Sequence, residues 1–345
     1  MPELRIDPLT GDRTIVAGAR AERPGGGFSA EPRPPIDPEK DPFLGGHEDR
    51  TPPEVDALRP DGGERDGPGW TVRSVPNLYP ALDGGPGELV ADESEHDDPL
   101  AGAQRGDPDL LTSRPALGAH EVIVNGPQAV SSVSELGAEQ LETAMGMWRR
   151  RMLAHDDSPY VHVLVNEGRE AGASLPHTHA QLYALGFVPA AVARERERFT
   201  AHANRTQGRN LLEDLVQEEV RRRERVVSID SEAVAICPFA SRVPFQLQIV
   251  PRRPRPRYQD DGPLGASLLS DVLGRLAGVL GALPPLNLWV RTAPRGAAYF
   301  CWRIDVMPRL THLAGLELGT GVNLNILPPE RAAALLREAS QRAVR

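Results

Sequence analysis

The sequence predicts an α+β fold of antiparallel strands, arranged in two halves of similar layout. Short strand-like segments are joined by tight turns, and each half contains a long amphipathic segment of helical periodicity. The order strand, strand, helix, strand, turn, strand occurs twice, which favours an antiparallel α+β fold over a doubly wound sheet. We expect the halves to span residues 1–190 and 191–345. The sequence contains neither a Gly-x-Gly-x-x-Gly motif nor a P-loop.

The first half contains several short apolar runs bounded by turn residues. Residues 4–17 predict two strands around a turn formed by Pro8, Gly11 and Asp12. Residues 22–69 are rich in proline, glycine and charge, which predicts an extended loop. The acidic stretch at residues 92–98 is expected to be a solvated loop. Further strands are predicted at residues 71–77, 118–125, 160–166 and 175–185.

Residues 137–155 predict the long helix of the first half. Leu141, Met145, Trp148 and Met152 recur every three or four residues, which places them on one face of a helix. We therefore expect these four side chains to face the core.

The second half begins with a charged helical segment at residues 190–225 that contains at least one break. A second amphipathic helix is predicted at residues 264–283. The last helix is predicted at residues 328–345, with proline in its first turn. Short strands are predicted at residues 234–236, 246–250, 286–290 and 299–306.

Composition excludes several classes of protein. The chain has 345 residues, with Lys+Arg 39 against Asp+Glu 48 and a net charge of −9, which argues against binding to nucleic acid or to an anionic membrane. Cys237 and Cys301 are the only cysteines, so we expect buried free thiols rather than a disulfide framework. No run approaches 18 apolar residues, and the N-terminal residues lack the apolar core of a signal peptide. We expect a cytoplasmic protein.

The candidate site lies in the strand predicted at residues 175–185. Side chains alternate along a strand, so His177, His179 and Gln181 are expected to share one face. Small residues at 172–174 would let a ligand approach the backbone, and Asn166 ends the preceding strand. Three interpretations remain open: a structural histidine pair, a metal-binding pair that needs further ligands, or a histidine nucleophile that attacks phosphorus.

Residues 174–181, Ser-Leu-Pro-His-Thr-His-Ala-Gln, resemble the His-x-His-x-Gln motif of the histidine-triad superfamily. This form is similar to that of the galactose-1-phosphate uridylyltransferase family. The resemblance extends over essentially the whole chain, in the order that the family shows. Further matching segments lie at residues 7–10, 20–24, 75–82, 118–124 and 308–321.

The resemblance implies two histidine-triad-like halves and a ping-pong exchange of hexose 1-phosphates on UDP-glucose. His179 would be the nucleophile, and His177 would support its orientation. Gln181 would hold the phosphate, because its amide can donate a hydrogen bond but cannot transfer a proton. The resemblance implies further contacts to phosphate from Ser174, Arg20 and Arg23, to the nucleotide from Asn77 and Asn166, and to the hexose from Glu317.

This sequence departs from the family at two metal sites. Relatives carry a Cys-x-x-Cys pair where this chain has Asp41 to Leu44, and a further ligand position falls at Ala129. A second site in relatives uses histidines where this chain has residues 301–303 and Arg291, and Glu195 is its one acidic remnant. We therefore expect no bound metal and no other cofactor.

The resemblance leaves donor and acceptor open. The first hypothesis is a uridylyltransferase that acts on a nucleotide sugar and a sugar 1-phosphate. The second is a phosphorylase of ADP-glucose or of a dinucleotide that uses the same histidine. The third is a homologue that binds nucleotide sugars without catalysis. Members of the family are often dimers, so a homodimer is a further expectation.

Overall fold

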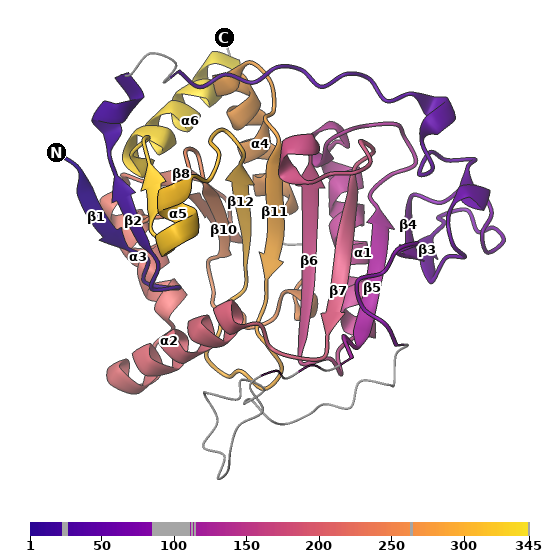
Figure 1. Ribbon diagram of the computed structural model, residues 1–345, viewed down its shortest axis with the longest axis horizontal. Helices are drawn as coiled ribbons and strands as arrows, with labels where there is room; N and C mark the ends of the chain where they lie inside the picture. Colours follow the sequence, from indigo (N-terminus) through magenta and orange to yellow (C-terminus); the bar gives the residue numbers. More distant parts are fainter. Residues whose placement is uncertain (23–26, 85–110, 112, 114, 263–264, 344–345) are drawn as a thin grey trace.

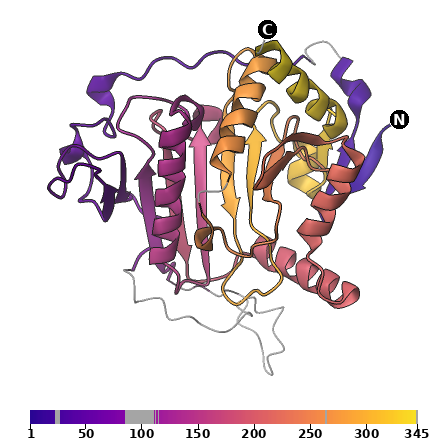
Figure 2. The ribbon, with the colours of Figure 1, turned by 180° about the vertical axis from the view of Figure 1, so that it is seen from behind.

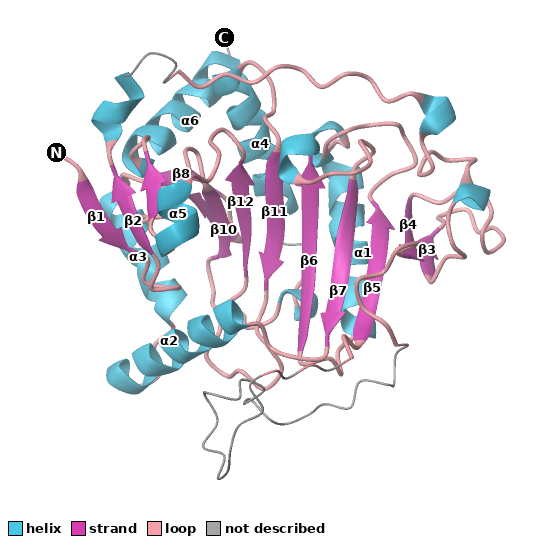
Figure 3. Cartoon of the chain, viewed as in Figure 1, coloured by secondary structure: helices cyan, strands magenta, loops and turns pink. Residues whose placement is uncertain are grey.

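The structure, a computed structural model, describes residues 1–22, 27–84, 111, 113, 115–262 and 265–343. It has the predicted α+β fold, with antiparallel strands and flanking helices (Figure 3). The acidic stretch at residues 92–98 lies outside the described residues. None of the helices in the described ranges is long and apolar enough to cross a membrane. The α-helices are α1 (Ala138–Ala154), α2 (Ala190–Thr206), α3 (Leu211–Arg222), α4 (Ala266–Leu280), α5 (Gly315–Thr320) and α6 (Pro329–Ala343).

One large sheet runs through most of the described molecule (Figure 1). Every neighbouring pair of its strands is antiparallel. In spatial order the strands are β3 (Asp56–Leu58), β4 (Val72–Pro76), β5 (Gly118–Val124), β7 (His179–Leu185), β6 (Tyr160–Glu167), β11 (Leu286–Arg291), β12 (Arg303–Pro308), β10 (Leu247–Pro251), β9 (Ala233–Ile236) and β8 (Val226–Ile229).

The two halves of the chain meet in the middle of this sheet, where β6 pairs with β11. From that seam outward, the first half contributes β6, β7, β5, β4 and β3. The second half contributes β11, β12, β10, β9 and β8 in the corresponding order. In each half a long helix, α1 or α4, separates the two strand pairs in sequence. This arrangement confirms the predicted architectural repeat.

Helices α1 and α4 lie on one face of the sheet (Figure 2). The four residues expected on the core face of α1, at 141, 145, 148 and 152, are all buried. Since side chains alternate along a strand, Ala180, Leu182 and Ala184 of β7 join this core. The side chains of His179, Gln181 and Tyr183 therefore point to the opposite face of β7. No described helix covers that face over β5, β7 and β6 (Figure 1).

A small sheet ties the N-terminal residues to the second half. It contains β1 (Glu3–Ile6), β2 (Arg13–Val16) and β13 (Asn323–Asn325), and β2 pairs with β13 in parallel. The predicted hairpin is confirmed, because β1 and β2 are antiparallel and the Gly11 N–H donates to the Asp7 carbonyl at 2.8 Å.

The structure corrects several predictions of local structure. Strand β3 lies within the loop predicted at residues 22–69, β13 was not predicted, and the strand predicted at residues 299–306 is β12, which begins at Arg303. Strand β7 begins at His179 rather than at residue 175, because Pro176 has no N–H and the Thr178 N–H donates outside the sheet ladder, to the Val130 carbonyl. Strand β8 was not predicted, since it is a four-residue edge strand directly after a charged helix. Helix α5 was not predicted either, because six residues are too few for a periodic pattern.

Candidate active site

His179 is the first residue of β7 and lies where the open face of the sheet begins. Its Nδ1 is 2.8 Å from the carbonyl oxygen of His177, which can only accept, so Nδ1 carries the hydrogen. The Phe43 ring packs 5.2 Å from the imidazole, and the residue is only 6% exposed. Among the described residues, Nε2 has no hydrogen-bond partner. This nitrogen therefore presents a free lone pair.

The surroundings of His179 keep its ring neutral. Burial lowers the pKa of His179 below its ordinary value of 6.5, and the charge of nearby His177 acts in the same direction. The hydrogen bond to the His177 carbonyl and the charge of Asp41 act in the opposite sense and only partly offset this effect. A neutral imidazole with one free nitrogen is the form that attacks phosphorus.

His177 does not share the open face with His179, and this part of the prediction is wrong. Because residue 177 precedes the strand, period-two alternation does not apply to it. Its side chain is fully buried, with Nδ1 2.6 Å from Asp41 Oδ2 and Nε2 2.9 Å from the Gly126 carbonyl oxygen. His177 therefore contacts His179 through its backbone carbonyl and not through its ring.

Gln181 lies on the open face of β7, as predicted, and its side chain is held by two neighbours. Oε1 accepts a hydrogen bond from the Tyr183 hydroxyl at 3.0 Å and lies 3.1 Å from His120 Nε2. The Ala81 N–H donates to His120 Nδ1, so the ring hydrogen is on Nε2 and points to Gln181. Burial lowers the pKa of His120, which keeps that ring neutral. The amide nitrogen of Gln181 remains available as a donor.

Three further predicted residues, Asn77, Asn166 and Ser174, lie near His179 and Gln181. Asn77 Nδ2 lies 3.1 Å from His120 Nε2, but both atoms are donors when Nε2 carries the hydrogen, so this contact places Asn77 beside the His120 ring without bonding to it. Asn166 follows Val165, which pairs with Ala180, so it lies beside His179 on the same face. Its Oδ1 accepts from Asn287 Nδ2 at 2.8 Å.

Ser174 is exposed in the turn before β7. It lines a cavity of about 880 Å³ together with Arg33, Arg169 and Arg309. Glu31 and Glu170 also line it, and Arg33 is paired with Glu167 at 3.2 Å. The Ser174 hydroxyl, Arg169 and Arg309 are therefore the groups that this cavity offers to an anion.

The remaining predicted residues do not join this group. Arg20 is exposed after β2, and Glu317 is half-buried in α5, where its Oε2 accepts from the Ala314 N–H. Both lie with the small sheet, and Figure 1 shows α5 over the other half of the large sheet from β7. Arg23 lies outside the described residues. One copy of the chain therefore does not bring Glu317 to His179.

Asp41, His120 and Tyr183 are the site residues that the sequence analysis did not single out. Asp41 lies far from residue 177 in the sequence, and its one signal is its place where relatives carry a thiol. His120 occurs in a segment that resembles the family, but no role followed from that likeness. Tyr183 continues the alternation of His179 and Gln181, so extending the period-two pattern by one step would have found it.

The residues at the two former metal positions do not fit a metal ion. Asp41 is hydrogen-bonded directly to His177, and no thiol is present. At the second position, Glu195 is paired with Arg303 through two bonds of 2.9 and 3.1 Å, and Arg291 Nε lies 3.3 Å from it. Guanidinium groups thus supply the positive charge beside this buried carboxylate. The described ranges contain no group of three or more metal-ligating side chains. The absence of metal stays a prediction.

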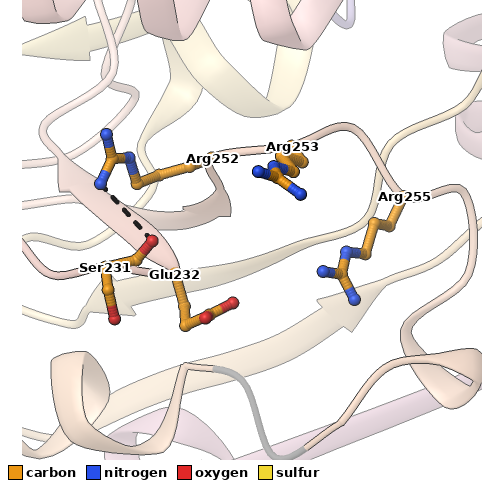
Figure 4. Close-up of a pocket in the computed structure, with 5 residues that line it drawn as sticks. All are labelled: Ser231, Glu232, Arg252, Arg253 and Arg255. Carbon is orange, nitrogen blue, oxygen red and sulfur yellow. Dashed lines mark hydrogen bonds between the residues drawn. The ribbon is translucent and has the colours of Figure 1, made fainter.

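A second hollow lies away from these residues, at the far end of β9 and β10 (Figure 4). Its volume is about 360 Å³, and Arg252 is bonded to the Ser231 carbonyl across it. Strands β6, β11 and β12 separate it from β7, and none of the predicted site residues lines it. The other residues that line it are Glu232, Arg253 and Arg255.

Comparison with known proteins places this geometry in a family. The profile of the galactose-1-phosphate uridyl transferase N-terminal domain matches residues 1–189, more than half of the chain. A second profile, described as a domain of unknown function (DUF4921), matches residues 141–342.

Individual relatives match almost the whole chain. The ADP-glucose phosphorylase of Arabidopsis thaliana is 29% identical over 98% of this chain and 93% of that protein. The galactose-1-phosphate uridylyltransferase of Thermotoga maritima is 26% identical over 98% of both chains. A crystal structure of an ADP-glucose phosphorylase from Arabidopsis thaliana with bound ADP-glucose superimposes with a TM-score of 0.78, at 26% identity and over 98% of both chains.

The fold and the relatives define an enzyme of the nucleotidyltransferase and phosphorylase type. Within that class, the chain belongs to the galactose-1-phosphate uridyl transferase family.

Proposed function

We propose that this enzyme transfers a nucleotidyl group from a nucleotide sugar to a phosphate-bearing acceptor through a covalent intermediate on His179. The observation that carries the proposal is the state of the His179 ring. Its Nδ1 is bonded to the His177 carbonyl, burial favours the neutral form, and Nε2 has no described hydrogen-bond partner. This is the arrangement that a phosphorus nucleophile requires.

The reaction proceeds in two displacements. The Nε2 lone pair of His179 attacks the α-phosphorus, and the bond from that phosphorus to the sugar 1-phosphate oxygen breaks. The sugar 1-phosphate leaves, and the nucleotidyl group stays on the ring as a phosphoramidate. A phosphate oxygen of the acceptor then attacks the same phosphorus and breaks the N–P bond, which returns a neutral His179. The Gln181 amide donates a hydrogen bond to the phosphate in both steps.

Ser174, Asn77 and Asn166 would contact the rest of the donor. Ser174 lines the cavity next to the start of β7, so its hydroxyl would bind a phosphate oxygen. Asn166 lies beside His179, Asn77 lies beside His120, and both would contact the nucleotide.

Two donor and acceptor pairs are candidates. The first is UDP-glucose with a hexose 1-phosphate, which the galactose-1-phosphate uridylyltransferases among the relatives support. The second is ADP-glucose with inorganic phosphate, which the match to ADP-glucose phosphorylase over nearly the whole chain supports. The pairs differ in base and acceptor, so one experiment separates them.

Intact-protein mass spectrometry after mixing with UDP-glucose or ADP-glucose tests the proposal. We expect a mass increase of one nucleotidyl group, and its size identifies the base. Galactose 1-phosphate and inorganic phosphate are then added separately to find which discharges the adduct. His179→Asn should form no adduct. The control His202→Asn changes a histidine of α2 that is paired with Asp214 of α3, and it should behave like the wild type. If neither donor forms an adduct, the proposal fails for both pairs.

The positions of Arg20 and Glu317 support a homodimer with a shared site. Arg20 is exposed and Glu317 is half-buried, both lie apart from His179 in one chain, and no described helix covers the sheet face around His179. A second copy would bring its Arg20 and Glu317 to that face, where they would bind phosphate and hexose.

Mixing two inactive variants tests the shared site. His179→Asn and Glu317→Gln would each be impaired alone. If the site forms between copies, a mixed dimer has one site with both native residues, so refolding the variants together should restore part of the activity. If each chain completes its own site, the mixture should stay as impaired as its components.

A further inference from the structure

The His177 ring is enclosed by hydrogen-bond acceptors. Its Nδ1 lies 2.6 Å from Asp41 Oδ2, and its Nε2 lies 2.9 Å from the carbonyl oxygen of Gly126. The side chains of His177 and Asp41 are 0% and 1% exposed, so water does not offer an alternative donor. A backbone carbonyl can only accept, and an ionised carboxylate can only accept. Both ring nitrogens of His177 must then carry hydrogen, which makes the ring an imidazolium.

The environment of Asp41 supports an ionised carboxylate. Oδ1 accepts from the Phe43 N–H at 3.0 Å, and Oδ2 faces the His177 ring, so each oxygen has a donor. Burial acts to raise the pKa of Asp41, but the hydrogen bond and the charge of His177 outweigh burial and hold the pKa below its ordinary value. Asp41 and His177 therefore form a buried ion pair.

This ion pair is connected to the nucleophile through one backbone atom. The carbonyl oxygen of His177 accepts from His179 Nδ1 at 2.8 Å. The residue after that carbonyl is held at both of its backbone groups, since the Thr178 N–H donates to the Val130 carbonyl and the Thr178 carbonyl accepts from the Asn125 N–H. Because the ring and this carbonyl belong to the same residue, a change in the position of the His177 ring would move the acceptor that fixes the His179 tautomer.

We propose that the Asp41–His177 ion pair is a positioning device for the nucleophile. By holding the His177 ring between the Asp41 carboxylate and the Gly126 carbonyl, it keeps the His177 backbone oxygen aimed at Nδ1 of His179 and so leaves the lone pair on Nε2. Asp41 acts through His177 and touches no reacting atom. The effect of this ion pair on catalysis rests on the proposed function. The charge state of the pair is independent of that function.

The charge state can be tested on the unaltered protein. Neutron diffraction from deuterium-exchanged crystals should show deuterium on both ring nitrogens of His177 and on Nδ1 alone of His179. A single deuterium on His177, or one on Nε2 of His179, would overturn the inference. This measurement gives an answer even if no donor forms an adduct, so it separates failure of the ion pair from failure of the proposed function.

The positioning role is tested by the rate of adduct formation in a single turnover. Asp41→Asn removes the negative charge but preserves the size of the side chain. We expect the adduct to form roughly 10- to 100-fold more slowly, because a misplaced nucleophile loses the near-attack geometry. The affinity for the nucleotide sugar, measured by calorimetry, should change less than about twofold, since Asp41 is buried behind His177.

Glu219→Gln is the matched control. Glu219 is a buried carboxylate in α3 that pairs with Arg225 at 3.0 Å, remote from His179. Both variants neutralise one buried ion pair, so both should lower the melting temperature. Only Asp41→Asn should slow adduct formation. Equal rates in the two variants would mean that the Asp41–His177 pair is merely structural.

Discussion

The Tyr183 hydroxyl donates to Gln181 Oε1 at 3.0 Å, and this bond determines which end of the Gln181 amide meets the substrate. His120 Nε2 lies 3.1 Å from the same oxygen. With two donors on Oε1, the amide NH₂ is the group that remains for an acceptor such as a phosphate oxygen. Two residues outside the His-x-His-x-Gln motif thus orient its glutamine.

Tyr183→Phe should slow adduct formation by about 2- to 10-fold, because one hydrogen bond of ~0.5–1.5 kcal/mol that orients Gln181 is lost. The ring itself stays, so its stacking on His120, with centroids 4.0 Å apart, is kept. Stopped-flow mixing with the nucleotide sugar, quenched for mass analysis, measures the rate. Tyr299→Phe removes a hydroxyl in the other half of the chain and should leave the rate unchanged. A Tyr183→Phe rate equal to that of this control would refute the orienting role.

Adduct formation should persist into mildly acidic solution. The nucleophile is neutral His179, and burial lowers its pKa below the ordinary 6.5, so the neutral form predominates to a lower pH than in a free imidazole. The rate should therefore be constant above pH 6.5 and fall as the pH drops through the lowered pKa. Single-turnover rates between pH 4.5 and 8 provide the test, with circular dichroism to verify folding at each pH. A midpoint at or above 6.5 would contradict the environment described for this ring.

The stability of the fold should depend on the guanidinium groups around the buried carboxylate of Glu195 and should not change when a chelator is added. Arg303→Met removes the two shortest hydrogen bonds to Glu195 and the guanidinium group that lies 3.0 Å from Asp305. We therefore expect the free energy of unfolding to fall by about 3–5 kcal/mol. Urea denaturation measures this change. Adding Glu195→Gln to that variant should recover part of the loss, because it removes a buried charge whose remaining partner is Arg291 at 3.3 Å. EDTA should leave the melting temperature of the wild type unchanged, and a clear decrease would contradict the prediction that no metal is bound.

Local patterns were sufficient for most of the fold. The periodicity of Leu141, Met145, Trp148 and Met152 identified α1 and its buried face, because one helix face repeats every three or four residues. Alternation identified Gln181 on the open face of β7. The same rule failed for His177, since it holds only inside a strand and residue 177 precedes β7.

Contacts between distant segments could not be read from such patterns. Asp41 meets His177 across 136 positions, and His120 meets Gln181 across 61. Both contacts depend on how the sheet and its loops are assembled, so neither residue carries a local signal of its partner. The motif residues therefore came from the sequence, whereas the residues that position them came from the structure.

Gln181→His should shorten the life of the nucleotidyl intermediate. The glutamine amide can donate a hydrogen bond to the phosphate but cannot take a proton from water, whereas an imidazole at the same place can do both. We expect hydrolysis of the isolated adduct in buffer without acceptor to rise by about tenfold or more. Mass spectrometry of the adduct over time measures its decay. Gln217→His, on the exposed face of α3, adds a histidine elsewhere and should decay like the wild type. Equal adduct lifetimes in the two variants would show that Gln181 does not protect the intermediate from water.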